Sequence, residues 1–161
     1  MIIDFIIDGN QTELDINPMT LLVNALKKRF DIVSAHYSCT SGECGDCAVL
    51  VNNQLQLSCL LPVFAIKGKE VVTYEGFKKT KDYADIVRAF SFAGYQPCEY
   101  CMPSKILSIH ALLETNLSPG KQEILDSLSG SSCFCSGYSA LIKAVNYAAA
   151  NRKRKRRVRK R

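Results

Sequence analysis

One nine-residue stretch decides the fold of this chain: Cys39-Thr40-Ser41-Gly42-Glu43-Cys44-Gly45-Asp46-Cys47. Its cysteines are spaced C-x4-C-x2-C, which is the plant-type spacing of thiolate ligands to a [2Fe–2S] cluster. Gly42 and Gly45 permit the tight backbone and the positive φ values that such a loop needs. A zinc knuckle is the alternative, but zinc sites favour paired C-x2–4-C units and fit this spacing poorly. The predicted ligands of the first cluster are Cys39, Cys44, Cys47 and the more distant Cys59.

A second set of four cysteines follows later in the chain. Cys98 and Cys101 are spaced C-x2-C, and Cys133 and Cys135 follow as C-x-C. C-x2-C pairs also occur in redox dithiols and in zinc ribbons. The C-x-C pair argues against a redox dithiol and against a zinc ribbon, but it excludes neither. From spacing alone, an iron–sulfur cluster and a zinc ion both remain open for this set.

The charge of the chain is concentrated at its C-terminal end. The 161 residues have a formal net charge of +6, but nine of the 21 lysines and arginines lie in Arg152–Arg161. The rest of the chain has 12 basic groups against 15 acidic ones, so a general nucleic-acid-binding domain is not indicated. We expect residues 151–161 to form a disordered, self-repelling tail. It could contact an acidic partner, RNA or anionic lipid, and a merely solvated tail is the favoured interpretation.

The cysteines are expected to be metal ligands in a reducing compartment. An even cysteine count can indicate disulfides in a secreted protein. However, Asp4 and Asp8 interrupt the apolar start of the chain and no basic n-region precedes it, so we expect no signal peptide. No stretch is apolar enough to span a bilayer. We therefore predict a cytoplasmic protein, in which clustered thiols usually bind metals or catalyse reactions.

The pattern of the chain predicts an α+β protein with two domains. Residues 1–77 are predicted as a β-grasp domain with a strand over Met1–Ile7, a second strand through Leu14 and Ile16, a helix capped by Thr20, and strands over Ala48–Val51 and Val71–Tyr74. Residues 78–150 are predicted as a helical domain with helices over Asp82–Ala93, over Ser104–Glu114, from Ser118-Pro119 onward, and over Gly137–Ala150.

Five sequence blocks together resemble one known family. They are Cys39-x4-Cys44-Gly45-x-Cys47, Ser58-Cys59-Leu60, Thr73-Tyr74-Glu75-Gly76-Phe77, Cys98-x2-Cys101-x-Pro103 and Ser129-Gly130-x2-Cys133-x-Cys135-x-Gly137-Tyr138. In their order and spacing the chain resembles the small iron–sulfur subunit of the molybdenum hydroxylases, the xanthine dehydrogenase and aldehyde oxidase family. The resemblance runs from about Ile2 to Ala149.

The resemblance implies a plant-type ferredoxin-like domain followed by a four-helix domain, with one [2Fe–2S] cluster in each. It implies that the second cluster is bound by Cys98, Cys101, Cys133 and Cys135. Molybdopterin is expected on a large molybdenum-binding subunit and FAD on a flavin subunit. Electrons would pass from the molybdenum site through the helical-domain cluster and then the ferredoxin-like cluster to flavin or another acceptor. The chain is then the iron–sulfur subunit of an oxidoreductase, with no catalytic residue and no complete active site of its own.

The chain departs from the family near the second cysteine set. The family has Gln directly before the first of these cysteines, where it contacts the molybdopterin, whereas here Pro97 takes that place and Gln96 lies one position earlier. Ser104 replaces a glycine, and Phe134 replaces the usual Arg inside C-x-C. Pro97 has no backbone N–H to donate. Pro97 and Gln96 are therefore altered candidates for the pterin contact.

These departures motivate a second hypothesis, a free-standing ferredoxin-like carrier without a molybdenum partner. A third hypothesis is a zinc-stabilised interaction module with a basic arm. The two histidines are expected to have structural or surface roles, His36 beside the first cysteine loop and His110 on an amphipathic helix. No catalytic triad and no Gly-rich phosphate loop is present in the sequence.

Overall fold

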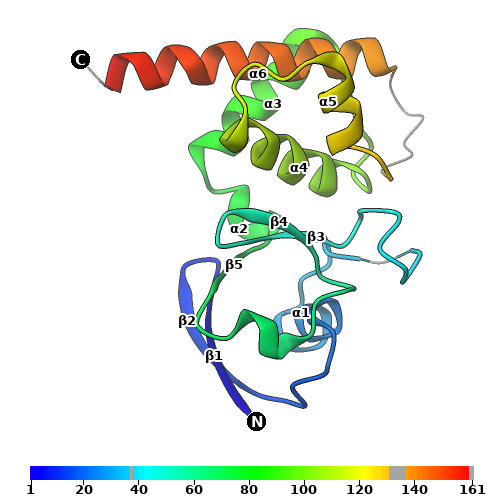
Figure 1. Ribbon diagram of the computed structural model, residues 1–161, viewed down its shortest axis with the longest axis vertical. Helices are drawn as coiled ribbons and strands as arrows, with labels where there is room; N and C mark the ends of the chain where they lie inside the picture. The colour runs from blue at the N-terminus through cyan, green and yellow to red at the C-terminus, as the bar shows by residue number, and fades with distance from the viewer. Residues whose placement is uncertain (37, 131–136, 160–161) are drawn as a thin grey trace.

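The computed structural model describes residues 1–36, 38–130 and 137–159. A β-sheet with its helix forms one half of the molecule, and a group of helices is stacked on it to form the other half (Figure 1). We call these the sheet half and the helical half. The predicted α+β class, a ferredoxin-like domain followed by a helical domain, is confirmed.

The sheet half contains a five-stranded mixed sheet in the order β2-β1-β5-β3-β4. Its strands are β1 (Ile2–Ile7), β2 (Asn10–Asp15), β3 (Ala48–Val51), β4 (Gln54–Leu57) and β5 (Glu70–Val72). β1 and β5 are parallel, while β1–β2, β3–β4 and β3–β5 are antiparallel. Apolar residues of β1, of β3 and of helix α1 (Leu22–Phe30) share one core, which includes Phe5, Leu26 and Val49. A helix packed in this way against a mixed sheet is the predicted β-grasp arrangement.

Three details of the sheet half differ from the sequence prediction. The strand β4 has no counterpart in that prediction. Thr20 does not cap α1, because Leu21 forms an extended bridge with Pro62 and the helix begins only at Leu22. The predicted strand Val71–Tyr74 is wrong at its end, since Thr73 caps the short helix α2 (Tyr74–Phe77) by accepting a hydrogen bond from the Gly76 amide at 3.3 Å.

The corner between β5 and α2 is fixed by Asp8, in the turn between β1 and β2. Its carboxylate accepts hydrogen bonds from the amide and from the hydroxyl of Thr73, each at 2.7 Å. A Cβ at Gly76 would lie 2.1 Å from Asp8 Oδ1, so a larger residue does not fit there. These contacts explain why a Thr and a Gly stand in the Thr73–Phe77 block.

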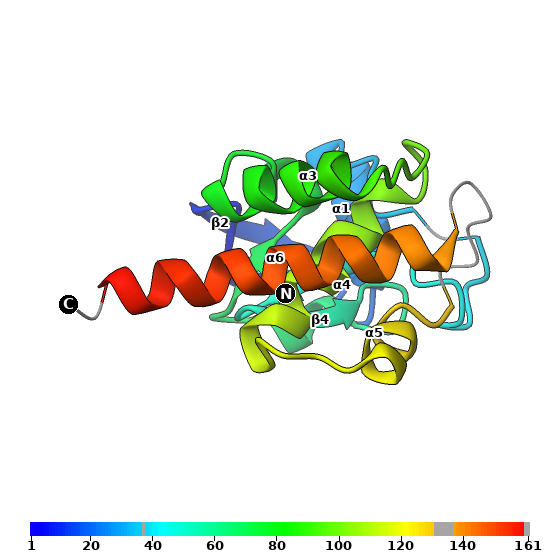
Figure 2. The same cartoon turned by 90° about the horizontal axis from the view of Figure 1, so that it is seen from above.

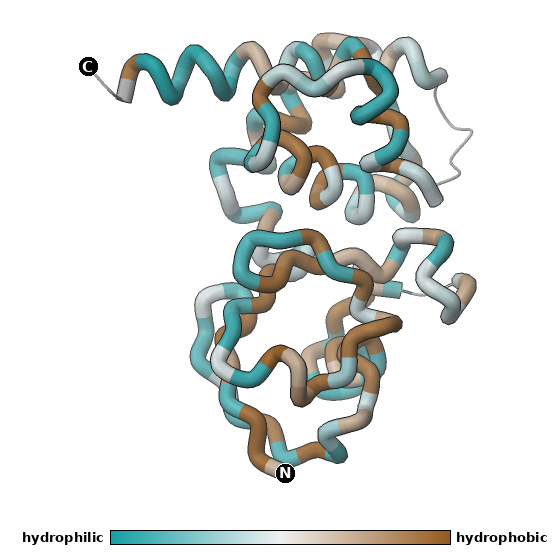
Figure 3. The backbone as a smooth tube through the Cα atoms, in the orientation of Figure 1, coloured by the Kyte–Doolittle hydropathy of each residue, from teal (hydrophilic) through white to brown (hydrophobic). Residues whose placement is uncertain are grey.

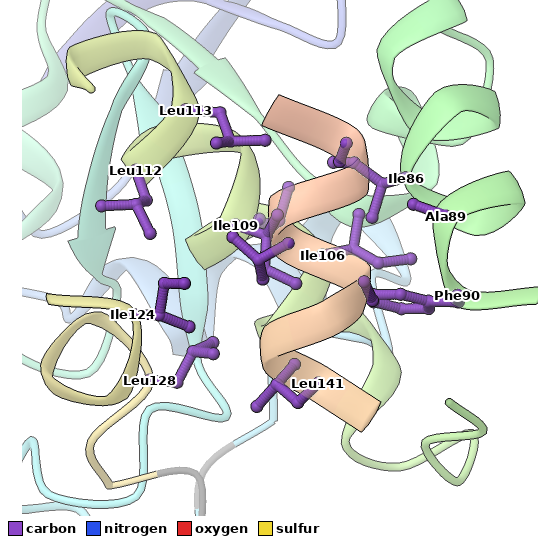
Figure 4. Packing of buried hydrophobic residues seen from close by; sticks show 14 of the residues in the cluster. Ile86, Ala89, Phe90, Ile106, Ile109, Leu112, Leu113, Ile124, Leu128 and Leu141 are labelled. Carbon is purple, nitrogen blue, oxygen red and sulfur yellow. The ribbon is translucent and has the colours of Figure 1, made fainter. Parts of the chain in front are cut away.

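The helical half is made of α3 (Lys81–Ala93), α4 (Met102–Thr115), α5 (Lys121–Ser127) and α6 (Tyr138–Arg159). Thr80 caps α3 by accepting from the Tyr83 amide at 3.2 Å, and Gly94 ends it in the left-handed conformation. α5 begins at Lys121 rather than at the predicted Ser118-Pro119, because Asn116 Oδ1 accepts from the Ser118 amide at 2.8 Å and holds that segment in a turn. Figure 4 shows apolar side chains of all four helices meeting in one core.

The two halves share an apolar contact as well as a chain connection. Leu50 of β3 and Phe77 of α2 belong to the core of the helical half, and α4 lies against β3 and β4. The buried His110 of α4 extends this contact, since its Nε2 lies 3.1 Å from Asn53 Oδ1 in the β3–β4 turn. The boundary between residues 77 and 78 stays a prediction. In the part of the chain that the structure describes, no helix is long and apolar enough to cross a membrane.

The expected disorder of the basic tail is wrong for residues 151–159, which continue α6 as a helix. Arg152 is nearly buried and pairs with Glu114 at 2.8 Å. Further along, Lys155 pairs with Asp85 of α3 and Arg156 with Glu114. The block does not simply repel itself, because acidic side chains of α3 and α4 neutralise part of its charge. Figure 2 shows α6 lying across the helical half and projecting past it, and Figure 3 shows its end as mainly hydrophilic.

Candidate iron–sulfur centres

The first cysteine set is brought together by the β3–β4 hairpin and the loop before it. Cys47 directly precedes β3 and Cys59 follows β4, so the antiparallel pairing of Ala48 with Leu57 places them side by side. Both thiols are buried and belong to one small apolar cluster with Val23. Ser58 holds this junction by donating from its amide and from its hydroxyl to the carbonyl oxygen of Cys47, at 3.1 and 2.7 Å.

The other two cysteines of this set, Cys39 and Cys44, form a second pair. The amides of Glu43 and Cys44 both donate to Cys39 Sγ, at 3.3 Å each. The loop that makes this possible has positive φ at Gly42 (81°) and Gly45 (75°), as its glycines predict. Gly42 also lies against the segment that follows Cys59, because a Cβ there would be 2.5 Å from Leu60 Cδ1.

The four thiols therefore arrive as two pairs, Cys39 with Cys44 and Cys47 with Cys59. Within residues 1–36, 38–130 and 137–159, no three His, Cys, Asp or Glu side chains are grouped around one point as for a single metal ion. A [2Fe–2S] cluster with four thiolate ligands takes two of them on each iron. The donor set and its pairing fit a two-iron cluster.

Cys39 and Cys47 differ in the charge that they favour. The amide of Cys44 and then the hydroxyl and amide of Ser41 stabilise the thiolate of Cys39 and lower its pKa to about 6. Burial raises the pKa of Cys47 to about 11, and the adjacent Cys59 thiol adds to this effect. Iron is bound by thiolates, so metal binding must release a proton from Cys47, whereas Cys39 is largely ionised at neutral pH.

The second cysteine set is described only in part. Cys98 and Cys101 are half-buried in a turn before α4, where the Cys98 carbonyl accepts from the amides of Cys101 and Met102 at 3.1 and 2.9 Å. Cys133 and Cys135, with Phe134 between them, lie outside the described residues. Their role as ligands stays a prediction. None of the six described cysteines forms a disulfide.

The altered pterin-side residues lie in the segment that leads into α4 and in its first turn. Pro97 is buried, while Gln96 is exposed. Ser104 is buried in the first turn of α4, and its hydroxyl donates to the Cys101 carbonyl at 3.2 Å. The hydroxyl thus stabilises the turn of the second cysteine set. The pterin contact of Gln96 and Pro97 stays a prediction.

The two cysteine-bearing segments touch each other, which sequence reasoning missed. The Tyr100 hydroxyl, between Cys98 and Cys101, lies 2.5 Å from the Ser38 hydroxyl beside Cys39. A Cβ at Gly130 would lie 2.1 Å from the Glu43 carbonyl oxygen, so Gly130 also approaches the first loop closely. An aromatic residue inside a C-x2-C pair was the available signal, but its partner could not be identified without the fold.

Comparison with known proteins supports the same family along almost the whole chain. Residues 73–146 match a family described as a [2Fe-2S] binding domain. The chain is 31% identical over 142 residues to the nicotinate dehydrogenase small FeS subunit of Eubacterium barkeri, covering 88% of this chain and 90% of that protein. It is 30% identical over 140 residues to a probable xanthine dehydrogenase subunit of Bacillus subtilis (strain 168), covering 86% of this chain and 80% of that protein.

A solved structure has the same fold. The crystal structure of quinoline 2-oxidoreductase from Pseudomonas putida 86 superposes with a TM-score of 0.83, covering 96% of each chain at 24% identity. Its likeness concerns the fold, while the two relatives above establish kinship in sequence. Together with the paired thiols of the first cysteine set, these findings lead to one conclusion. The chain belongs to the family of small iron–sulfur subunits of molybdenum hydroxylases, which includes xanthine dehydrogenase and aldehyde oxidase.

Proposed function

We propose that this chain is the electron-transfer subunit of a molybdenum hydroxylase and that it binds two [2Fe–2S] clusters. The observation that carries the proposal is the pairing of Cys39 with Cys44 and of Cys47 with Cys59 in a chain that is similar to small FeS subunits over nearly its full length. Cys98, Cys101, Cys133 and Cys135 are the proposed ligands of the second cluster.

The residues of the chain bind the clusters, orient them and limit the access of water. When bound, each cluster accepts and gives up one electron at a time. The amides of Glu43 and Cys44 stabilise negative charge on Cys39 Sγ, which is one of the ways in which a protein sets the potential of a cluster. The buried Cys47 and Cys59 keep one side of the first site out of water. No side chain of this site is proposed to transfer a proton.

The proposed partners are a large molybdenum-binding subunit that carries molybdopterin and a flavin subunit that carries FAD. The two relatives support this assembly, because their names identify them as subunits of nicotinate dehydrogenase and of a probable xanthine dehydrogenase. Electrons would enter at the helical half and leave from the sheet half. The projecting basic end of α6 is a proposed contact for an acidic surface of a partner.

A second candidate function is a free-standing iron–sulfur carrier. The observation in its favour is the exposed Gln96 beside the buried Pro97, at the place where the family contacts molybdopterin. Copurification of tagged chain with a molybdenum-containing subunit supports the first function. A monomer that carries both clusters and binds no such subunit supports the second.

The direct test is anaerobic purification followed by iron and acid-labile sulfide analysis and by EPR after dithionite reduction. Two [2Fe–2S] clusters require about four irons and four sulfides per chain and give two reduced signals. Two irons or fewer per chain in oxygen-free material would overturn the two-cluster proposal. A colourless protein that contains zinc would indicate a zinc-stabilised module instead.

A further inference from the structure

We propose that Tyr100 is the residue that positions the first cysteine loop against the second, so that the two centres exchange electrons at a fixed separation. The inference rests on the proposed function, in which both centres carry electrons. Tyr100 stands between Cys98 and Cys101, and its side chain crosses from the helical half to the sheet half. Nothing in the cysteine spacing requires a tyrosine there, so its contacts need an explanation of their own.

The first step is a chain of hydroxyl groups that ends at a buried carboxylate. Ser38 Oγ donates to Asp46 Oδ2 at 3.3 Å, so its single proton is engaged there. The Tyr100 hydroxyl, 2.5 Å from Ser38 Oγ, must then be the donor in the contact between them. Ser38 and Asp46 stand beside Cys39 and Cys47 at the two ends of the first loop. The Ser38 hydroxyl therefore joins the two ends of that loop, and the Tyr100 hydroxyl donates to it from the other cysteine segment.

The second step is the ring of Tyr100. It packs on His36 with the ring centroids 3.9 Å apart and the planes tilted by 50°. His36 is held in turn by the Val33 carbonyl, 3.3 Å from its Nδ1. The neighbouring Ser34 donates from its amide and hydroxyl to the Glu75 carboxylate at 3.1 and 2.6 Å, which anchors this segment to α2. The Tyr100 ring thus packs on a segment, Ser34 to His36, that hydrogen bonds hold in place.

The third step is the place of this contact relative to the proposed ligands. Tyr100 is bonded to Cys101, and Ser38 is bonded to Cys39, so one hydrogen bond connects a ligand of each centre through adjacent residues. With both centres bound, Cys98 and Cys101 would hold the centre that gives up one electron, and Cys39 and Cys44 the centre that takes it up. No proton is transferred, and Tyr100 is neither oxidised nor reduced. Its part is to hold the loops at one separation.

The expected effect follows from the strength of one hydrogen bond. Such a bond contributes about 0.5–1.5 kcal/mol, which corresponds to about a 2- to 12-fold change in an opening equilibrium. In the full chain with both centres loaded, Tyr100→Phe keeps the ring and removes the donor. Hydrogen exchange of the Glu43 and Cys44 amides should accelerate by this factor.

The electrostatic readout separates this role from general stability. In Tyr100→Phe, Ser38 still donates to Asp46 but loses the hydrogen bond that polarises its hydroxyl, so it offsets less of the Asp46 charge. Negative charge near the first centre disfavours an added electron. The midpoint potential of the first centre, followed by EPR, should shift to more negative values, with a smaller shift at the second centre. Ser38→Ala should shift the potential in the same direction and at least as far, because it also removes the bond to Asp46. The double variant should match Ser38→Ala, because Tyr100 acts through the Ser38 hydroxyl.

A matched control is Tyr147→Phe, which removes the same hydroxyl from a ring stacked on Phe92, with centroids 4.0 Å apart, in the helical half. It should leave both potentials and the loop exchange unchanged. Loop exchange and a first-centre potential that stay at wild-type values in Tyr100→Phe would overturn the inference, as would effects of the two single variants that add fully in the double one. Absence of two reduced signals in the wild-type chain would instead overturn the proposed function.

Discussion

The two halves of the molecule reach their structure by different means. In the sheet half, the loop that carries Cys39 and Cys44 is shaped by positive-φ glycines and by amides directed at a sulfur. In the helical half, four helices pack on a continuous apolar core, and a buried cluster of His110 and Arg152 joins α4 to α6. Under the proposed function, a bound metal centre adds to the stability of the first arrangement, whereas the second depends on burial of apolar side chains. Each of the following predictions tests that difference.

The largest expected effect is the loss of a whole centre. Cys44→Ser should abolish the EPR signal of the first centre and leave the second signal, because Cys44 and Cys101 lie in different halves and are proposed ligands of different centres. Cys101→Ser should do the reverse. Iron content should fall by about half in each variant. Loss of both signals from a chain that stays folded would show that the halves are not independent.

A core substitution in the helical half should have a large effect on stability. Leu113 is fully buried in the core of the helical half, so Leu113→Ala should lower the free energy of unfolding by about 2–5 kcal/mol. Denaturant unfolding followed by circular dichroism measures this change. The exposed Leu60→Ala is a poor control because it touches Gly42, and Val158→Ala on the exposed end of α6 serves instead. The control should change stability by less than about 0.5 kcal/mol.

Arg152 should contribute an intermediate amount. Its guanidinium is nearly buried and donates to Glu114 at 2.8 Å and to the His110 carbonyl at 3.4 Å. Arg152→Met should cost about 1–3 kcal/mol, since it removes the hydrogen bonds of a nearly buried guanidinium and leaves Glu114 with Arg156 as its remaining arginine partner. The same change at the exposed Arg154 should be nearly neutral. Equal unfolding free energies for the two variants would show that Arg152 stabilises the protein no more than the exposed Arg154 does.

The smallest expected effect is a pH dependence from His110. Burial and then the adjacent Arg152 charge lower the pKa of His110, so the folded protein favours the neutral ring. As the pH falls, His110 of the unfolded chain is protonated near pH 6.5, whereas His110 of the folded chain is protonated only at a lower pH. Stability from this group is thus complete above pH 6.5 and is lost as the pH falls toward the lower folded pKa. The slope is at most about 1.4 kcal/mol per pH unit, and His110→Gln should remove it.

Much of this architecture could be predicted because its signals are local. The thiol spacing and the glycines at positions 42 and 45 define the first loop, and the apolar periodicity near Ile86 and Ile109 defines two helices. The start of α1 could not be predicted, because it depends on the bridge of Leu21 to Pro62, which is distant in sequence. The helical structure of residues 152–159 could not be predicted either, because it depends on Glu114 and Asp85. The same holds for the contact of Tyr100, whose partner is Ser38. Such partners become visible only when the chain is folded.

The absence of a side chain at Gly130 has a further consequence. This residue has a φ of +92° and meets the backbone carbonyl of Glu43, which cannot rotate away as a flexible side chain could. A methyl group at this position would collide with the Glu43 carbonyl oxygen, and the positive φ would be strained for any residue with a Cβ. Gly130→Ala should therefore separate the two halves at the contact between Gly130 and Glu43, while the apolar core of each half stays intact.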